Sequence, residues 1–295
     1  ATRGKNMKRI LLTTTSLVLA AGVAQADVSF SGAGQVGLYQ DPSVASMADD
    51  LAVYSGYDLN VAVSGASDTG ITYSVGFDFG GGNTADWNDD YALDTQDNVS
   101  DAKPAVTLGY AGATIVIDKD GVDDLYDDGN HGDIKISTTL GGLSLAVVAE
   151  TDADDSTNSN SFSVSGAADS LTWSLVTTNG DTLDNAASKV TVGYTVSDAL
   201  GLTFKHDTKS GAVDAVNTVT AAYTMGALTL TVAADDNNDH DITAAYTSGA
   251  LSASYTVNEE DFWKMNGSYD LGGGAAAFVS MDESEWTAVG MSFAF

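Results

Sequence analysis

The sequence predicts an all-β fold, a transmembrane antiparallel β-barrel of 16 to 18 strands, and three observations predict it. Apolar residues alternate with polar or small residues in one segment after another, which is the period of a strand with two different faces. The connections between these segments alternate between short turns and longer acidic loops. The segment 287–295 is flat and apolar and ends on Phe295. Such a strand would be an exposed edge in an open sheet, whereas a barrel pairs its last strand with its first.

The two terminal strands are the elements that would close this barrel. On the last one, four apolar residues alternate with small or polar ones: Val289, Met291, Phe293 and Phe295. On the first, Val28, Phe30, Val36 and Leu38 share one face. We therefore expect residues 287–295 to pair with residues 28–38. A secreted β-sandwich is the alternative fold.

Between these two strands, alternating segments follow one another without a helical period. Their apolar positions cover 59–63, 71–79, 106–110, 113–117, 134–140, 143–147, 162–164, 171–175, 190–196, 202–204, 219–223, 228–232, 242–246, 251–257, 263–271 and 275–281. Eight short turns give eight hairpins, and the terminal strands bring the count to eighteen. Without the hairpin at 161–178 the count is sixteen. Either number leaves a water-filled interior.

The longer connections are acidic, and we expect all of them at the same end of the barrel. They cover 40–50, 80–103, 118–133, 151–160, 179–187, 206–214, 235–241, 258–261 and 282–285. Short turns on one rim and long polar loops on the other are typical of bacterial outer-membrane barrels. A β-sandwich has no reason to sort its loops in this way.

The first 26 residues are predicted to be an upstream extension and a signal peptide that is removed. Met7-Lys8-Arg9 is a basic start, an apolar stretch follows, and Ala24-Gln25-Ala26 is a small-x-small cleavage site. Residues 27–295 then form a single barrel domain. This part holds all 41 Asp and Glu residues and seven of the 11 Lys and Arg residues, none of them arginine. We therefore expect no nucleic-acid partner for so acidic a chain.

A repeated tyrosine precedes several of the short turns, on the apolar face of a strand. The clearest copies are spaced 23 residues apart, and the set consists of Tyr110, Tyr194, Tyr223, Tyr246 and Tyr269. Aromatic rings with one polar end are most stable at a membrane interface. The repeat predicts an aromatic girdle at the short-turn rim. Ordinary core tyrosines are the alternative reading.

The chain resembles the alphaproteobacterial general diffusion porins of the Rhodobacter type. The matching stretches are 28–37 (VSFSGAGQVG), 68–74 (DTGITYS), 268–275 (SYDLGGGA) and 289–295 (VGMSFAF). The resemblance implies a homotrimer in the outer membrane of a Gram-negative bacterium, in contact with outer-membrane lipid and lipopolysaccharide. It also implies passive diffusion of small hydrophilic solutes, a terminal strand read by the barrel-assembly machinery, and sixteen strands rather than eighteen.

Two features depart from that family. Its porins narrow the pore with a long third loop that folds inward, but here the third loop, 118–133, is short. The second loop, 80–103, is longer and could replace it. The family also places an arginine cluster opposite that loop, and residues 27–295 contain no arginine.

Charged residues on the polar parity of the strands and in the third loop are candidates for lining the pore. The basic candidates are Lys135, Lys189, Lys205 and Lys264, and the acidic ones are Asp118, Asp120, Asp123, Asp124, Asp127 and Asp128. If the third loop folds inward, carboxylates face lysines across water, and the excess of acids favours cations. In the alternative, these carboxylates remain solvated at the cell surface.

Acidic runs in two other loops are candidates for calcium binding, because oxygen ligands at short spacing suit a hard cation. They contain Asp152, Asp154 and Asp155, and Asp235, Asp236 and Asp239. None has the spacing of an EF-hand loop.

Catalysis has little support in the sequence, so we expect a protein that is not an enzyme. The three histidines, His131, His206 and His240, lie in or beside loops, without zinc spacing or an arrangement typical of a catalytic triad. The remaining alternatives are a barrel enzyme and a structural or adhesive surface protein, either a filled barrel or a β-sandwich.

Overall fold

The computed structural model describes residues 26–43, 50–86, 92–96, 104–126, 130–151, 160–179, 186–208 and 214–295. This part of the chain is all β, and it contains no helix able to cross a membrane. The strands are β1 (Asp27–Gln40), β2 (Ala52–Ala66), β3 (Thr72–Asp86), β4 (Ala92–Thr95), β5 (Ala105–Tyr110), β6 (Ala113–Asp123), β7 (His131–Leu140), β8 (Leu143–Ala149), β9 (Ser161–Ala168), β10 (Leu171–Thr178), β11 (Ala187–Ser197), β12 (Leu200–Asp207), β13 (Val216–Met225), β14 (Leu228–Asp235), β15 (His240–Ser248), β16 (Leu251–Asn258), β17 (Trp263–Gly272), β18 (Ala275–Asp282) and β19 (Thr287–Ala294).

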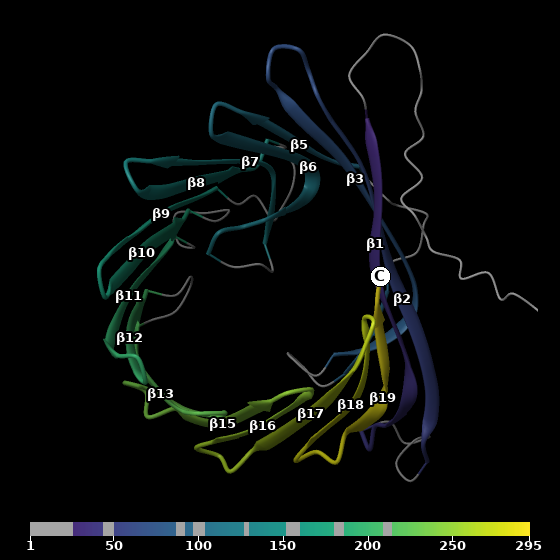
Figure 1. The fold of residues 1–295 in the computed structure, drawn as a ribbon. Helices are drawn as coiled ribbons and strands as arrows, with labels where there is room; N and C mark the ends of the chain where they lie inside the picture. The colour runs from purple at the N-terminus through teal and green to yellow at the C-terminus, as the bar shows by residue number, and fades with distance from the viewer. Residues whose placement is uncertain are drawn as a thin grey trace, which may run out of the picture.

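The sheet closes on itself, as Figure 1 shows in a view along the barrel. Each strand of the wall pairs antiparallel with its neighbour, and β1 pairs with both β2 and β19. In the β1–β19 register Gly37 lies opposite Gly290. The backbones of Gly32 and Phe295 exchange two hydrogen bonds of 3.0 and 3.1 Å. The predicted pairing of the two ends is confirmed, and the β-sandwich alternative is wrong.

The wall contains eighteen of the nineteen strands. Among the described strands, β4 pairs only with the end of β3 and takes no part in the cylinder, so β3 is followed in the wall by β5. Eighteen is the number obtained by counting short turns, whereas the family resemblance favoured sixteen. The hairpin at 161–178 is present as β9 and β10.

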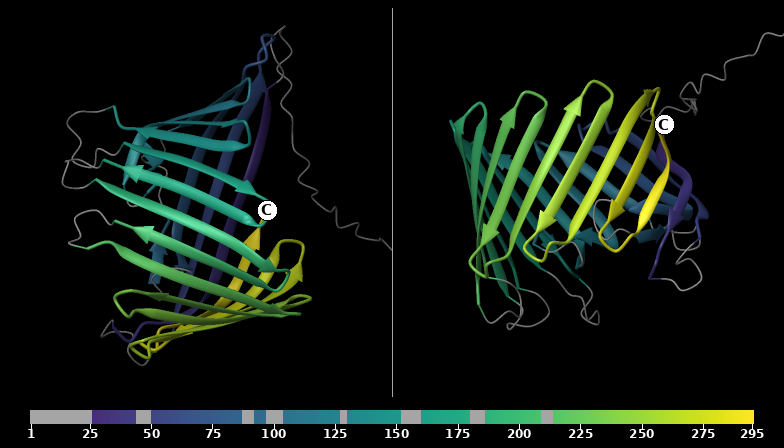
Figure 2. Two further views of the ribbon diagram at one scale, coloured as in Figure 1. Left: turned by 90° about the vertical axis from the view of Figure 1, so that its left-hand side faces the viewer. Right: turned by 90° about the horizontal axis from the view of Figure 1, so that it is seen from below.

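The two faces of the wall differ as the alternating pattern predicts. Large apolar side chains on the predicted apolar parity are exposed around the outside, including Phe30, Ile136, Val219, Leu230 and Phe293. Because successive side chains of a strand lie on opposite faces, the Ser, Thr and Lys residues between them face the interior. The strands cross the wall at a tilt, as Figure 2 shows.

The two rims also differ. At one rim the hairpins close tightly, and glycines such as Gly112, Gly142 and Gly226 adopt positive φ there, which is typical of two-residue hairpin turns. The other rim carries the longer connections. One of these is shorter than predicted: the connection expected at 235–241 is a turn of four residues, 236–239. The connections expected at 258–261 and 282–285 lie one residue later, at 259–262 and 283–286.

Strand residues also extend into the loops predicted at 80–103 and 118–133. β3 continues to Asp86 and pairs there with β4, while β6 continues to Asp123 and β7 begins at His131. The alternating pattern is weak in these acidic and glycine-rich stretches, so the extensions were not predicted. Both bring backbone into the barrel interior, and Figure 1 shows ribbon inside the ring next to β6.

Candidate functional site in the barrel interior

From β9 to β16 the interior wall is lined mainly by hydroxyl groups. Threonines and serines occupy most of the inward-facing positions of β9 to β16; Thr191, Thr203 and Thr231 are examples. The four lysines named from the sequence, Lys135, Lys189, Lys205 and Lys264, also lie on inward parity and are partly buried. The inward face is therefore polar, as is typical of transmembrane β-barrels.

The connection between β6 and β7 folds onto the interior wall rather than extending away from the rim. The β6–β7 register shifts between Ile117 and Val122, and Asp120 lies there with φ of 57°. Beyond this irregularity the chain reaches β9, where the Leu125 backbone N–H donates a 3.0 Å hydrogen bond to Ser161 Oγ. A strand irregularity of this kind bends the strand away from its partner.

Tyr126 attaches this connection to β11 and β12, on luminal residues. Its hydroxyl donates a short hydrogen bond to the carboxylate of Asp207, a buried residue. Lys189 Nζ donates a 3.1 Å hydrogen bond to the Tyr126 carbonyl and lies 4.5 Å from the centre of its ring. Lys189 and Asp207 are direct cross-strand partners, so one tyrosine bridges an acid and a base on the wall.

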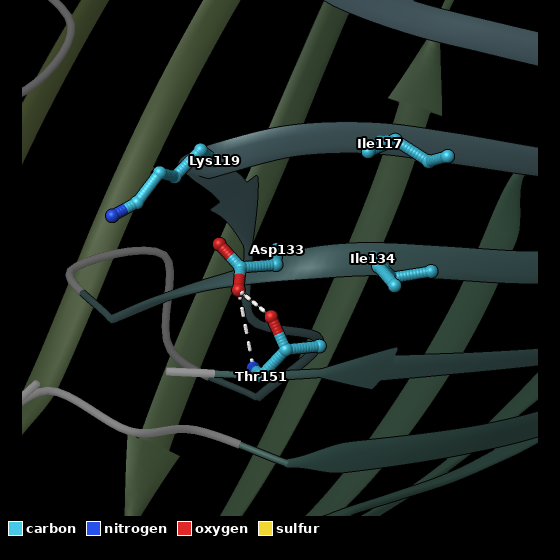
Figure 3. Close-up of a pocket in the computed structure, with 5 residues that line it drawn as sticks. All are labelled: Ile117, Lys119, Asp133, Ile134 and Thr151. Carbon is cyan, nitrogen blue, oxygen red and sulfur yellow. Dashed lines mark hydrogen bonds between the residues drawn. The ribbon is translucent and has the colours of Figure 1, made fainter. Parts of the chain in front are cut away.

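Asp133 is the centre of a second polar cluster near the same rim. The residue is buried; its carboxylate accepts a 3.0 Å hydrogen bond from the Asp120 backbone N–H and further ones from Thr151. Figure 3 shows the Thr151 contacts beside a cavity of about 360 Å³ that Ile117, Lys119 and Ile134 also line. Carboxylate oxygens of Asp120, Asp133 and Glu150 lie within 4.8 Å of one another.

The other acidic candidates of the third loop are dispersed. Asp124 is buried, and its carboxylate accepts a 2.7 Å hydrogen bond from the Tyr126 backbone N–H. Asp123 is exposed, and its Oδ1 lies 3.5 Å from His131 Nε2. Asp118 lies on β6 and is partly buried. Asp127 and Asp128 lie outside the described residues.

The acidic run 235–239 makes local hydrogen bonds in its turn. Asp235 Oδ1 accepts from the backbone N–H groups of Asn237 and Asp239 at 2.8 and 3.1 Å. Asp236 accepts from the backbone and side chain of Asn217 at 2.9 and 2.6 Å. Asp152, Asp154 and Asp155 lie outside the described residues, so calcium binding by either run stays a prediction.

Two carboxylates of the long-loop rim have lowered pKa values. The side-chain and backbone hydrogen bonds from Asn217 lower the pKa of Asp236. A hydrogen bond from the His240 backbone N–H, 2.9 Å long, lowers the pKa of Glu259. In each case a donor stabilises the charged form of an exposed group.

The residues named for the outer surface lie on the outward face. Tyr110, Tyr194, Tyr223, Tyr246 and Tyr269 are exposed and precede the short turns. On β19, Val289, Met291 and Phe293 are exposed on the outer face as well, and Phe295 follows them.

Sequence reasoning missed a group of aromatic residues on the inward parity. Tyr54, Phe278 and Trp286 are buried together with Ala85 and Ala288, and Tyr39 packs against them. The available signal was parity: Tyr39, Tyr54 and Phe278 fall between the outward apolar positions of their strands, where the rest of the wall carries small or polar residues.

The described fold is similar to solved porin structures. One is a mutant of the porin from Rh. blastica, with 16% sequence identity and a TM-score of 0.55, covering 91% of this chain and 100% of that one. A triple mutant of the Rhodopseudomonas blastica porin gives 15% identity, a TM-score of 0.55 and the same coverage. An engineered protein described for its asymmetric conductivity has 15% sequence identity and a TM-score of 0.56, again covering 91% of this chain and 100% of that one. At this identity the likeness establishes the fold.

No protein-family model matches the sequence, and no curated protein matches it either.

Proposed function

We propose that this protein is a porin of the bacterial outer membrane, a water-filled channel through which small hydrophilic solutes and ions diffuse passively. The observation that carries the proposal is the closed eighteen-strand wall with apolar side chains outside and hydroxyl-bearing ones inside. Barrels of 16 to 18 strands are wide enough to leave an aqueous channel. The similarity to solved porins supports the same reading.

The charge inventory supports a channel that favours cations. Asp58 and Asp78 lie on the inward parity of β2 and β3, and the acidic residues Asp123 and Asp124 lie in the inward-folded connection. The lysine beside that connection, Lys189, contacts Tyr126. An excess of carboxylates near a narrow passage raises the local concentration of cations.

The cellular setting follows from the same proposal. Residues 1–26 comprise an upstream extension and a signal peptide that is removed on export, and residues 27–295 form the inserted domain. The outward tyrosines at the short-turn rim lie at one membrane interface, and the terminal strand with Phe295 serves the barrel-assembly machinery. Outer-membrane lipid and lipopolysaccharide surround the barrel, and three copies associate.

The test is a planar-bilayer recording with the purified and refolded chain 27–295 under a KCl gradient. We expect discrete conductance steps and a reversal potential whose sign reports preference for K⁺ over Cl⁻. Gel mobility with and without boiling serves as the folding control, because a folded barrel migrates differently from its unfolded form.

The absence of conductance steps would contradict the proposal if the same preparation shows the gel mobility of a folded barrel. Conductance steps with a reversal potential of the opposite sign would support the channel function but contradict the cation preference. Migration of the unboiled protein at the size of a single barrel would contradict the trimer.

A further inference from the structure

The end of β3 and the short strand β4 form a hairpin that lies on the interior face of the wall. Beyond Gly82 the chain leaves its register with β2, and residues 83–86 pair with residues 92–95. Ala85 and Leu93 are direct partners in this hairpin, and Ala85 is buried. Both pack with the inward aromatic residues described above.

The wall is shaped to receive this hairpin. One cross-strand row runs Tyr54, Gly37, Gly290, Phe278 over β2, β1, β19 and β18. Two rings therefore flank two glycines, and a Cβ at Gly37 or Gly290 would lie 2.9 Å from the Tyr54 ring or 3.1 Å from the Phe278 ring. With Tyr39 and Trp286 on the next positions, this row forms a flat aromatic seat, which we call the platform.

A glycine turn and a glycine on the wall bring the hairpin onto the platform. Gly82 has φ of +79°, a conformation that favours glycine. Gly56 on β2 faces the interior, and a Cβ there would lie 2.4 Å from the carbonyl oxygen of Asn83. The backbone of the hairpin therefore passes directly over β2, closer than any side chain would permit.

Gln35 holds the hairpin in register with the wall. Its side-chain carbonyl accepts a 3.0 Å hydrogen bond from the Ala85 backbone N–H, and its amide nitrogen lies 3.5 Å from the Ala85 carbonyl oxygen. Side chains within the hairpin and just after it are hydrogen-bonded as well: Asn83 donates to Thr95, and Gln96, which follows β4, donates to Thr84. The hairpin is thus an ordered element on β1.

The hairpin and the β6–β7 connection lie against opposite sides of the barrel. The hairpin covers β2, β1 and β19, and the connection is attached to β9, β11 and β12. In the strand order of the wall, β11 is nine strands from β1 in either direction. Two inward elements on opposite walls leave the open passage between them.

From this geometry we infer that the β3–β4 hairpin is a second constriction element, which sets the upper size of the solutes that the channel passes. The inference rests on the proposed channel function. Ala85 and Leu93 face the platform, so Thr84, Asp86 and Asp94 occupy the opposite parity of the hairpin, toward the passage. They place two carboxylates and a hydroxyl at the edge of the opening, which suits cationic and neutral hydrophilic solutes.

The first test displaces the hairpin without cutting the wall. Gly56→Val puts a side chain into the space occupied by the Asn83 backbone, so we expect the hairpin to leave its seat. Gly201→Val is the matched control, because Gly201 also faces the interior and has no atom within 4 Å of an added Cβ. We expect single-channel conductance to rise by about twofold in Gly56→Val and to stay unchanged in Gly201→Val, since conductance follows the narrowest section.

The second test replaces residues 83–96 with a short Gly-Ser linker, and gel mobility confirms that each variant is a folded barrel. In liposome-swelling assays with neutral oligosaccharides of increasing size, we expect this variant and Gly56→Val to admit larger sugars than the wild type and Gly201→Val.

The outcomes separate the two proposals. A folded wild type without conductance would overturn the channel function itself. A wild type that conducts, with folded Gly56→Val and linker variants of unchanged conductance and size limit, would overturn the constriction by the hairpin alone.

Discussion

The two elements that enter the barrel interior are attached to the wall by different chemistry. The β6–β7 connection is attached largely through polar groups: Tyr126 bridges Lys189 and Asp207, and Leu125 donates its N–H to Ser161. The β3–β4 hairpin is seated on rings and small residues, and Gln35 supplies the hydrogen bonds to the wall. One attachment depends on charge and hydrogen-bond geometry, the other on shape.

This difference shows how a barrel interior can hold inserted segments. The described barrel has a polar interior face and no central hydrophobic core, so the cluster around Tyr54 and Trp286 is a local core formed between a hairpin and the wall. Burial of aromatic area stabilises such a cluster without paired charges. The polar attachment requires a donor and an acceptor at each contact, because an unpaired buried group is costly.

The largest expected effect is in the aromatic platform. Trp286→Ala removes a buried ring of the local core, and we expect the free energy of unfolding to fall by about 3 kcal/mol. Denaturant titration of the folded barrel in detergent measures the change. Trp263→Ala is the control: Trp263 is partly exposed on β17, so its loss should be clearly smaller. Equal losses in the two variants would contradict a stabilising platform.

The polar attachment should respond to removal of a single hydroxyl. Tyr126→Phe keeps the ring over Lys189 and removes the donor to Asp207. In a double-mutant cycle with Asp207→Ala, which removes the acceptor, we expect a coupling free energy of about 1.5–3 kcal/mol, as for a hydrogen bond to a charged group. Unfolding free energies of the four proteins supply the cycle. Additive losses would show that the two side chains do not interact in the folded protein.

Charge on the hairpin should affect selectivity more than stability. We expect Asp86→Asn combined with Asp94→Asn to lower the K⁺ to Cl⁻ permeability ratio by about twofold at about 0.1 M salt, where charges act over about 10 Å. The measurement is the reversal potential under a KCl gradient. Asp198→Asn, at the short-turn rim, is the control and should leave the ratio unchanged. An equal decrease of the permeability ratio in Asp198→Asn would show that net charge, and not the position of Asp86 and Asp94, sets the selectivity.

The smallest effect concerns the rim away from both elements. Hydrogen bonds from Asn217 lower the folded-state pKa of Asp236 below its ordinary value of 3.8. The stabilisation by the charged form is therefore present above pH 3.8 and is lost as the pH falls through the lowered pKa. In Asn217→Ala the pKa of Asp236 should return toward 3.8, as a carboxyl NMR titration would show. An unchanged pKa would contradict this cause.

The wall could be predicted from sequence because its physics is local. Val289, Met291 and Phe293 alternate with small residues along a single strand, and the same two-residue period recurs in each hairpin, so faces and closure follow without knowledge of contacts. The short-turn count also gave eighteen strands where the family resemblance favoured sixteen.

The inward elements depend on contacts between residues distant in sequence. Tyr126 meets Asp207 across 81 positions, and Gln35 meets Ala85 across 50. Neither pair has a pattern of its own in the sequence. The sequence does contain a signal for the platform, since Tyr54 and Phe278 fall at strand positions that are otherwise small or polar. Their ability to receive the hairpin, however, depends on Gly37 and Gly290, which lie between them in the folded wall.

The most direct test of the account is the chemical accessibility of two neighbouring residues on β14. The chain has no cysteine, so Thr231→Cys and Leu230→Cys each introduce a single thiol, one on the inward parity and one on the outward parity. In proteoliposomes, a membrane-impermeant cationic thiol reagent should label Thr231→Cys rapidly and Leu230→Cys hardly at all. Equal labelling, or faster labelling of Leu230→Cys, would contradict a water-filled interior inside an apolar wall.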